Sequence, residues 1–380
     1  MKKEAENGRA ARWLRENRLS ILVLLLAAVL FAILRIWAAP EPEEDMGAAE
    51  YASYETAKIT ALLSDSTEAD ENADGAYRGD QLLLAEVTSG TYKGETLQVY
   101  NYVGPLYGAP VQVGDSVVLT ISTYSDGSHT ATVFEYNRSG PLLLVAALFL
   151  LVTVLVGGKT GAKSLVALAI TLGCLFFILL PLLMKGLPTL PTVFLLCAYI
   201  AVVSLTILGG VRKKTVCAML GAIAGTALAM LFGMLAQGVC RINGLRLSDV
   251  EPLLQLRQQG VPIGLRHLLT GGIVISALGA VMDVTMGISS AISEVHTVNP
   301  ALGRRELFRS GMNVGRDMVG TMTNTLILYL YSLGLSTHQL LSSAYFAVEV
   351  ISGLSSSVGV ILSIPITALI CAVLYAQKKT

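Results

Sequence analysis

The segment "PLLLVAALFLLVTVLVGGKTGAKSLVALAITLGCLFFILL", residues 141–180, decides the fold class of this chain. It contains two apolar runs that are separated by the short basic connection at residues 157–163. Each run approaches the ~20 residues that an α-helix needs to cross the ~30 Å hydrocarbon core of a bilayer. No charged residue interrupts either run. The segment therefore predicts two transmembrane helices whose connection lies on one side of the membrane.

The composition of the whole chain extends this prediction. Of its 380 residues, 53% are hydrophobic and only 14% are charged, which is too little charge for the surface of a soluble protein of this size. The apolar runs predict an α-helical polytopic membrane protein with about eight spans: residues 19–38, 141–157, 164–184, 191–210, 215–236, 267–287, 317–335 and 358–376. The lipid bilayer is accordingly the first expected partner.

The first 18 residues form a basic N-terminus, and residues 19–38 follow as a first transmembrane anchor. Trp37 and Pro40 fit a small-residue signal cleavage site poorly, so we expect the anchor to be retained. Cytoplasmic connections of membrane proteins are enriched in Lys and Arg, which predicts that both termini are cytoplasmic. The four arginines of the loop at residues 237–266 depart from this rule.

Residues 39–140 predict an extracytoplasmic β-rich domain that begins with an acidic linker. This stretch holds 17 acidic and 4 basic residues, so we expect no nucleic-acid partner. Strand-like runs separated by turn residues occupy 81–87, 95–101, 115–121 and 130–136, while residues 54–63 fit a strand or a short helix. Four or five short strands predict a small β-barrel or sandwich. The remaining residues, 141–380, form the seven-span membrane domain.

The sequence carries no pattern for a metal site, a cofactor or a nucleotide. Five cysteines lie in or beside apolar runs without metal-ligand spacing, and the histidines of the membrane domain are scattered. We therefore expect no metal, no cofactor and no ATP-driven chemistry within this chain.

Three acidic residues of the membrane domain lie within polar stripes. In "NVGRDMVGTMTNTLILYLYSLG", residues 313–334, helical offsets of three, four, seven and eight place small and polar residues on the same face as Asp317. The same offsets surround Asp283 and Glu349 with glycine, serine and other small residues. The candidate residues of a substrate or ion pathway are Asp283, Ser290, Glu294, Arg316, Asp317, Thr321, Asn324 and Glu349.

A charged side chain at the bilayer centre costs at least about 2.5 kcal/mol on insertion scales, so such residues usually face water, a cavity or a partner. We therefore expect the sixth span, the seventh span and the Glu349 helix to surround a polar seam. A structural interpretation of Asp317 and Arg316 stays open. An acid near a helix N-terminus is favoured by the helix dipole, and an arginine is expected at a cytoplasmic interface.

Residues 342–376 are too long for one span, because a helix of that length would extend about 50 Å. We expect a break within residues 352–357, which would make the Glu349 segment a separate interfacial or re-entrant helix. Two Gly-xxx-Gly patterns, at residues 221–225 and 311–315, predict close helix packing.

Three segments carry a resemblance to a known family: "MDVTMGISSAISEV", "LFRSGMNVGRDMVGTMTNTLILYLYSLG" and "AVEVISGLSSSVGVILSIPITALI". These segments resemble the YibE/F-like family of bacterial multispanning membrane proteins. The order of the parts is also similar, so the resemblance covers nearly the whole chain. The resemblance implies a location in the bacterial cytoplasmic membrane. It implies no reaction and no catalytic residue.

Two functions follow as hypotheses. The first is a transporter or permease for an unknown small solute or ion, which would use the acids of the polar seam. The second is a scaffold or accessory subunit whose external domain binds a protein partner. An intramembrane enzyme is disfavoured, because Asp317 follows Arg316 at a helix entrance and lacks the Gly-x-Gly-Asp signature of intramembrane aspartyl proteases.

Overall fold

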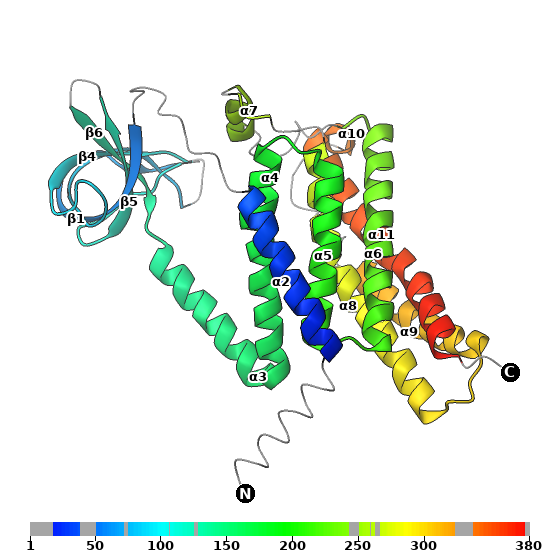
Figure 1. Ribbon diagram of the computed structural model, residues 1–380. Coiled ribbons are helices and arrows are strands. Elements are labelled where there is room, and N and C mark those ends of the chain that lie inside the picture. The colour runs from blue at the N-terminus through cyan, green and yellow to red at the C-terminus, as the bar shows by residue number, and fades with distance from the viewer. Residues whose placement is uncertain are drawn as a thin grey trace, which may run out of the picture. The chain divides into compact units, whose positions relative to one another are not determined.

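The computed structural model divides the chain into two compact units, a β unit of residues 41–152 and a helical unit of residues 1–40 and 153–380 (Figure 1). The residues that it describes are 18–38, 51–71, 75–105, 107–124, 128–242, 251–258, 260–262, 267–323 and 337–376.

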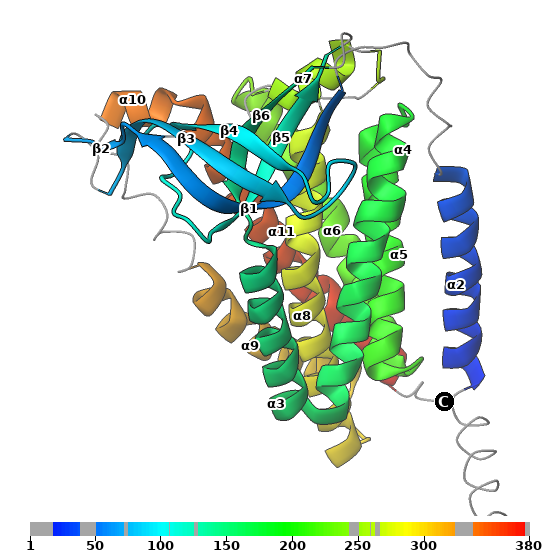
Figure 2. The same ribbon diagram turned by 90° about the vertical axis from the view of Figure 1, so that its left-hand side faces the viewer.

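The β unit is a small barrel (Figure 2). Its strands are β1 (Tyr51–Asp65), β2 (Glu68–Ala69), β3 (Tyr77–Val87), β4 (Thr96–Val103), β5 (Ser116–Thr123) and β6 (His129–Tyr136). The sheet order is β1-β5-β6-β4-β3-β2, and an additional pairing of β1 with β3 closes the ring. All pairings are antiparallel except the short parallel pairing of β4 with β6. This pattern is that of an OB-type five-stranded barrel. It confirms the barrel alternative, and it shows that residues 54–63 are a strand.

The alternation of side chains along each strand builds the barrel core. Residues of β4 are exposed and buried in strict alternation, as expected when one face of a strand is covered. The inward positions are filled by Ala57, Ile59, Leu83, Ala85, Val87, Leu97, Val99, Val117, Leu119, Ile121 and Ala131.

Two amides interrupt this apolar core, Gln81 of β3 and Asn101 of β4, which are 2% and 1% exposed. Gln81 Nε2 donates to Asp65 Oδ2 at 2.9 Å and to the carbonyl of Val111 at 3.3 Å. Its Oε1 accepts hydrogen bonds from Asn101 Nδ2 and from the backbone N–H of Val111, both at 2.9 Å. Asn101 Nδ2 also donates to the carbonyl of Ala109 at 3.0 Å. The two amides thus fasten the segment between β4 and β5 to the barrel wall.

The helical unit contains most of the predicted spans. Its longer helices are α2 (Arg18–Ala38), α3 (Ser139–Cys174, which begins in the β unit), α5 (Thr189–Gly209), α6 (Lys213–Val239), α8 (Leu268–Val298), α9 (Arg304–Thr323) and α11 (Ala344–Tyr375). A π-helix, η1 (Leu175–Leu179), and α4 (Leu180–Met184) continue α3, while α7 (Glu251–Gln258) and α10 (Thr337–Ser342) are short. Among the described residues, six helices are long and apolar enough to cross a membrane, with residues 139–184 counted as one.

That 46-residue helix contains a turn at Gly158, whose φ of 53° and ψ of −132° are not helical. Positive φ is tolerated by glycine because it lacks a Cβ. The turn therefore separates two helices at the position predicted between residues 141–157 and 164–184. Of the predicted span at residues 317–335, the part beyond Thr323 lies outside the described residues. The total of eight spans stays a prediction.

Helices α6, α8, α9 and α11 pack through small residues. Gly221 and Gly225 of α6 lie against Thr367 and Ser363 of α11, and a Cβ added to Gly225 would lie 2.6 Å from Ser363 Cβ. On α9, Gly311 lies against Ala368 of α11, where an added Cβ would approach to 3.0 Å. Close approach of helix backbones explains both Gly-xxx-Gly patterns, as the sequence predicted.

The predicted break within residues 352–357 is wrong. α11 is continuous from Ala344 to Tyr375, and Figure 1 shows it running obliquely beside α6, with no re-entrant helix at Glu349. The small residues of this segment instead permit close packing: Ser355 is fully buried, and Ser356 contacts α8. At 32 residues the helix is about 48 Å long, so it is longer than the ~30 Å core is thick.

Candidate functional site

α8 separates its apolar face from its polar stripe. Its apolar face includes Val281, Val284, Ile288 and Ile292, which are completely buried against the neighbouring helices. The polar stripe predicted around Asp283 is exposed or half-buried along its whole length: Gly272, Ser276, Gly279, Asp283, Gly287, Ser290 and Glu294. The apolar face of α8 therefore packs against the neighbouring helices, and its polar stripe stays accessible to polar groups.

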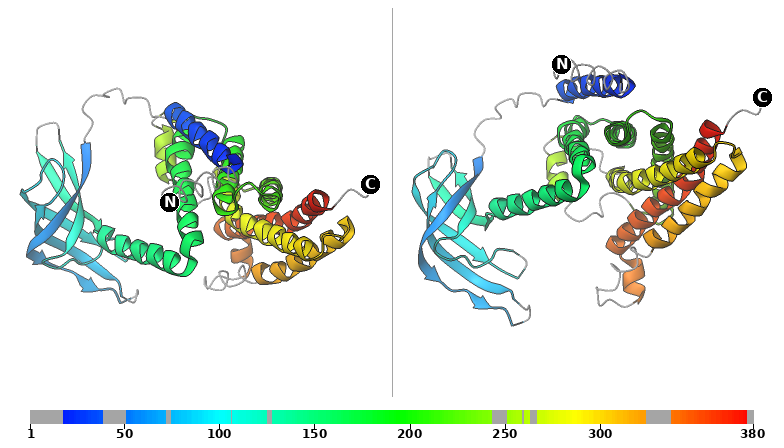
Figure 3. Two further views of the ribbon diagram at one scale, coloured as in Figure 1. Left: turned by 60° about the horizontal axis from the view of Figure 1, so that its bottom comes forward. Right: turned by 90° about the horizontal axis from the view of Figure 1, so that it is seen from below.

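Two neighbouring helices border this stripe, and Figure 3 shows α8, α9 and α11 side by side. Ser276 Oγ lies 3.2 Å from Ser356 Oγ of α11. A Cβ added to Gly287 would lie 3.4 Å from Met318 Cε of α9. Asp283 lies between these two contacts along α8, so both helices flank the position of its carboxylate.

Three contacts fix the register of α8 and α11. Besides the serine pair, Cys371 Sγ lies 3.5 Å from Ser289 Oγ, and Tyr375 Oη lies 3.1 Å from Ser293 Oγ. The residue numbers of the partners increase together along α8 and α11, so the two helices run parallel. Asp283 lies seven residues beyond Ser276, whereas Glu349 lies seven residues before Ser356. Their levels along the helices therefore differ by about 20 Å, which places the two acids at different depths.

α9 runs antiparallel to α8, because Gly311 contacts Ile292 whereas Met318 contacts Gly287. This register brings Thr321 to the level of Asp283 and Asp317 about one turn away from it. Arg316 and Asp317 are exposed. Asn324 lies outside the described residues.

The three acids make no direct pair. Within the described part of the chain, no hydrogen bond or ion pair joins the side chains of Asp283, Asp317 and Glu349. No group of three or more His, Cys, Asp or Glu residues suited to a metal ion occurs in that part either. The arrangement is a line of separate polar positions along one seam. It runs from the level of Glu349 through Asp283 and Ser290 to Glu294.

Sequence reasoning missed the polar contacts in the buried centre of the bundle. Gln237 Nε2 of α6 donates to Thr270 Oγ1 of α8 at 2.6 Å, and both side chains are buried. Ser289 and Ser293 bridge α8 to α11 as described above. Hydroxyl groups lie in nearly every apolar run of this chain, and their spacing alone does not tell which of them cross between helices.

Comparison with protein families identifies the membrane part of the chain. The family described as YibE/F-like protein matches residues 145–377, a range that begins beyond the strands of the barrel. The resemblance is therefore shown for the membrane part of the chain, and not for the β unit. Comparisons with curated proteins and with solved structures give no match. Because the family match covers more than half of its residues, the chain belongs to the YibE/F-like family of membrane proteins.

Proposed function

We propose that this protein is a transporter or permease for a small solute or ion. The observation that supports the proposal most is the line of polar positions on α8, bordered by α9 and α11. Measured along α8, the line extends from the level of Glu349 to Glu294, which is 25 residues or about 37 Å. This length exceeds the ~30 Å thickness of the hydrocarbon core. Polar groups at every depth are expected of a pathway, because charged side chains inside a membrane are costly unless they face water or a partner.

Asp283 is the central group of the proposed pathway. It lies near the middle of that line, with Thr321 at the same level and Asp317 about one turn away. A carboxylate there would take up a proton or a cation. Gly279 leaves space beside it, because no atom lies within 4 Å of a Cβ added there. Glu349 and Glu294 would attract the same ions at the two ends.

We place the protein in the bacterial cytoplasmic membrane with both termini in the cytoplasm and the barrel outside. The support is the basic character of residues 1–18, 157–163, 211–214 and 377–380. Reporter fusions at Asp126 and Lys378 should report opposite sides of the membrane. Reporters on the same side would contradict this orientation.

Reconstitution tests the transport function. Purified protein in liposomes that contain a pH-sensitive dye should carry a proton or monovalent-cation flux. Asp283→Asn keeps the shape of the side chain and removes the charge, so we expect a loss on the order of tenfold, the factor that 1.4 kcal/mol of lost ion binding gives. Glu306→Gln is the matched control. That carboxylate accepts from the backbone N–H of Gly303 at 2.8 Å, outside the seam, and the amide can accept the same hydrogen bond. Equal fluxes in wild type and Asp283→Asn would refute the role of Asp283.

Cysteine accessibility tests the seam without knowledge of the substrate. In a variant without the five native cysteines, Asp283→Cys and Ser290→Cys should react with a water-soluble thiol reagent. Leu231→Cys, on a 52% exposed position of α6, faces lipid in a membrane and should not react, because the hydrocarbon core contains no water. Protection of both seam cysteines would contradict a hydrated pathway.

One observation favours the alternative of a scaffold or accessory subunit. The barrel exposes two aromatic pairs: the rings of Tyr54 and Phe134 meet edge to face at 5.2 Å, and those of Tyr100 and Tyr102 stack at 6.4 Å. All four side chains are more than 40% exposed, and exposed aromatic residues are enriched in protein interfaces. Under this alternative, Tyr100→Ser with Tyr102→Ser would abolish association with a membrane or envelope partner, and the purified chain would carry no flux.

A further inference from the structure

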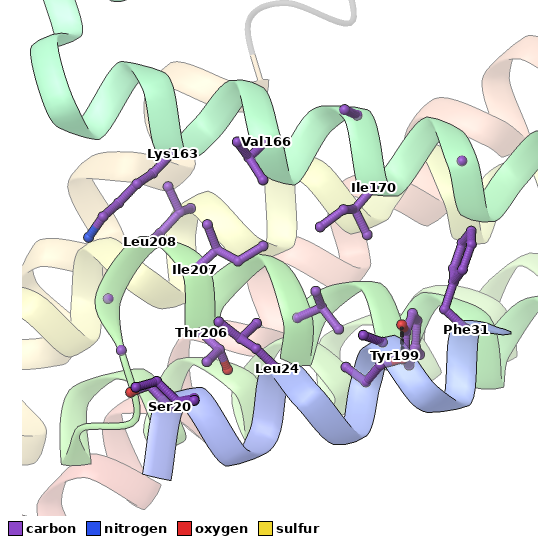
Figure 4. A pocket seen from close by; sticks show the side chains of 18 of the residues that line it. Ser20, Leu24, Phe31, Lys163, Val166, Ile170, Tyr199, Thr206, Ile207 and Leu208 are labelled. Carbon is purple, nitrogen blue, oxygen red and sulfur yellow. Dashed lines mark hydrogen bonds between the residues drawn. The ribbon is translucent and has the colours of Figure 1, made fainter. Parts of the chain in front are cut away.

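The helical unit contains a cavity of about 1280 Å³ between α2, α3 and α5 (Figure 4). The volume exceeds the ~300–1,000 Å³ of ordinary small-molecule pockets. Most of the lining is apolar and comes from all three helices, as shown by Leu24, Phe31, Val166, Ile170 and Ile207. The polar seam involves α8, α9 and α11, so this cavity is a separate feature.

One end of the cavity is basic. Its lining includes Lys163, Arg212 and Lys214 and, among the described residues, no acidic side chain. Figure 4 shows Lys163 at the end of the cavity where Ser20 and Leu208 also lie. Ser20 Oγ accepts a hydrogen bond of 2.8 Å from the backbone N–H of Val211, which ties the start of α2 to this end. The cavity thus joins an apolar interior to a cationic mouth.

The length of the cavity matches one leaflet of a bilayer. Its lining extends over twelve residues of α2, from Ser20 to Phe31, and over eleven residues of α5, from Tyr199 to Gly209. Eleven residues of helix rise about 16 Å, which is close to half of the ~30 Å hydrocarbon core. Tyr199 Oη also donates to the carbonyl of Ala27 at 2.8 Å, so α2 is held to α5 along this depth.

We propose that this cavity is a binding site for one anionic phospholipid. Its acyl chains lie between α2, α3 and α5, and its phosphate lies among Lys163, Arg212 and Lys214. Lysine and arginine recognise phosphate by charge and by N–H donation, and basic pockets between transmembrane helices bind anionic head groups. An apolar helix of a second copy would fill the interior but would leave the three cations without a counter-charge. The charge of the mouth therefore favours a lipid as the occupant.

The test measures the binding of phosphatidylglycerol and phosphatidylcholine to the purified full-length chain in mild detergent. Native mass spectrometry and thermal unfolding give the affinities. Wild type should bind phosphatidylglycerol in preference to phosphatidylcholine, with a stoichiometry of one. Lys163→Gln with Lys214→Gln should weaken phosphatidylglycerol binding roughly 30-fold, since each cation near an anionic head group contributes a factor of about five.

A charge-matched control separates the site from the general attraction of a basic surface. Lys159→Gln with Lys213→Gln removes two lysines from the same two segments, and neither residue lines the cavity. This variant should retain the affinity of the wild type within about threefold. Ala169→Trp fills the cavity and leaves the cations in place, so it should lower the binding of both lipids and remain informative if the lysine variant does not fold.

Three results would overturn the proposal. They are equal affinity of the wild type for the two lipids, equal loss in the control variant and the Lys163/Lys214 variant, and a lipid-free dimer by native mass spectrometry. The last result would assign the cavity to a second copy of the chain. Because the readout is lipid binding, these results do not depend on whether the protein carries a flux.

Discussion

Substitution of Gly225 by alanine probes the contact between α6 and α11. A Cβ at this position would lie 2.6 Å from Ser363 Cβ, 2.8 Å from Val281 Cγ1 and 3.1 Å from the carbonyl oxygen of Gly359. Two of these atoms belong to α11 and one to α8, and none is the free end of a flexible side chain. The added methyl group can therefore be accommodated only if the helices move apart.

The cost of this steric contact can be separated from the effect of the substitution on helix propensity. Where the backbone is helical, alanine stabilises a helix relative to glycine by up to about 1 kcal/mol. Gly238, in the same helix, has no atom within 4 Å of an added Cβ, so Gly238→Ala measures this gain alone. Overpacking of a tight contact typically costs about 1–3 kcal/mol. We expect Gly225→Ala to be less stable than Gly238→Ala by this amount.

The assay is the reversible unfolding of both purified variants in the same detergent, with wild type beside them. Ser363→Gly removes the nearest opposing atom, so the double variant with Gly225→Ala should recover part of the loss. Equal stability of Gly225→Ala and Gly238→Ala would show that α6 and α11 do not approach as closely as described. Gly-xxx-Gly packing between them would then be rejected.

Three further predictions concern other parts of the chain. Gly158→Ala should cost about 1–3 kcal/mol of unfolding free energy, because its positive φ is strained for alanine although no atom lies within 4 Å of an added Cβ, whereas Gly157→Ala should be neutral or up to about 1 kcal/mol more stable in the same unfolding assay. Gln81→Leu should leave the buried Asn101 amide without this partner, at a cost of about 1–3 kcal/mol, and hydrogen exchange by mass spectrometry should show lost protection in β3 and β4. Hydrogen bonds from Thr67 and Gln81 hold the pKa of Asp65 below its ordinary range, so the stability that they contribute is present near neutral pH and is lost as the pH falls below about 4. Asp65→Asn should therefore reduce the acid sensitivity of barrel unfolding followed by tyrosine fluorescence.

The class of the fold could be predicted from the sequence because lipid and barrel interiors impose simple periodicities. Apolar runs of about 20 residues located α2, α5 and α6 closely, and the alternation in β4 located a barrel strand. Residues 54–63 were ambiguous, since a half-polar segment of ten residues fits either period. Their pairing with two distant strands, β3 and β5, makes them a strand, and that information is not local.

The candidate site was predictable only as a set of helix faces. Offsets of three and four identify which side chains share a face with Asp283, because they follow from helix geometry alone. The depth of Glu349 relative to Asp283 depends on the register between α8 and α11, which the Ser276–Ser356 contact fixes. The same serines misled the prediction of a break. Small polar residues at high density are compatible with an unwound segment and with tight packing, and only the partner helix decides between them.

Closure of the barrel determines how another protein could recognise the β unit. β1 pairs with β3 on one side and with β5 on the other, and β6 joins β4, so each long strand has neighbours on both sides over at least part of its length. Many domains bind peptides by adding a strand to a free sheet edge, which uses main-chain hydrogen bonds and requires little of the peptide sequence. Between β4 and β6 the pairing covers only two residue pairs, so an edge of this kind remains chiefly along that seam. A partner that binds elsewhere on the barrel must therefore distinguish it by its side chains, and specificity in such an interaction would follow the sequence of the barrel surface.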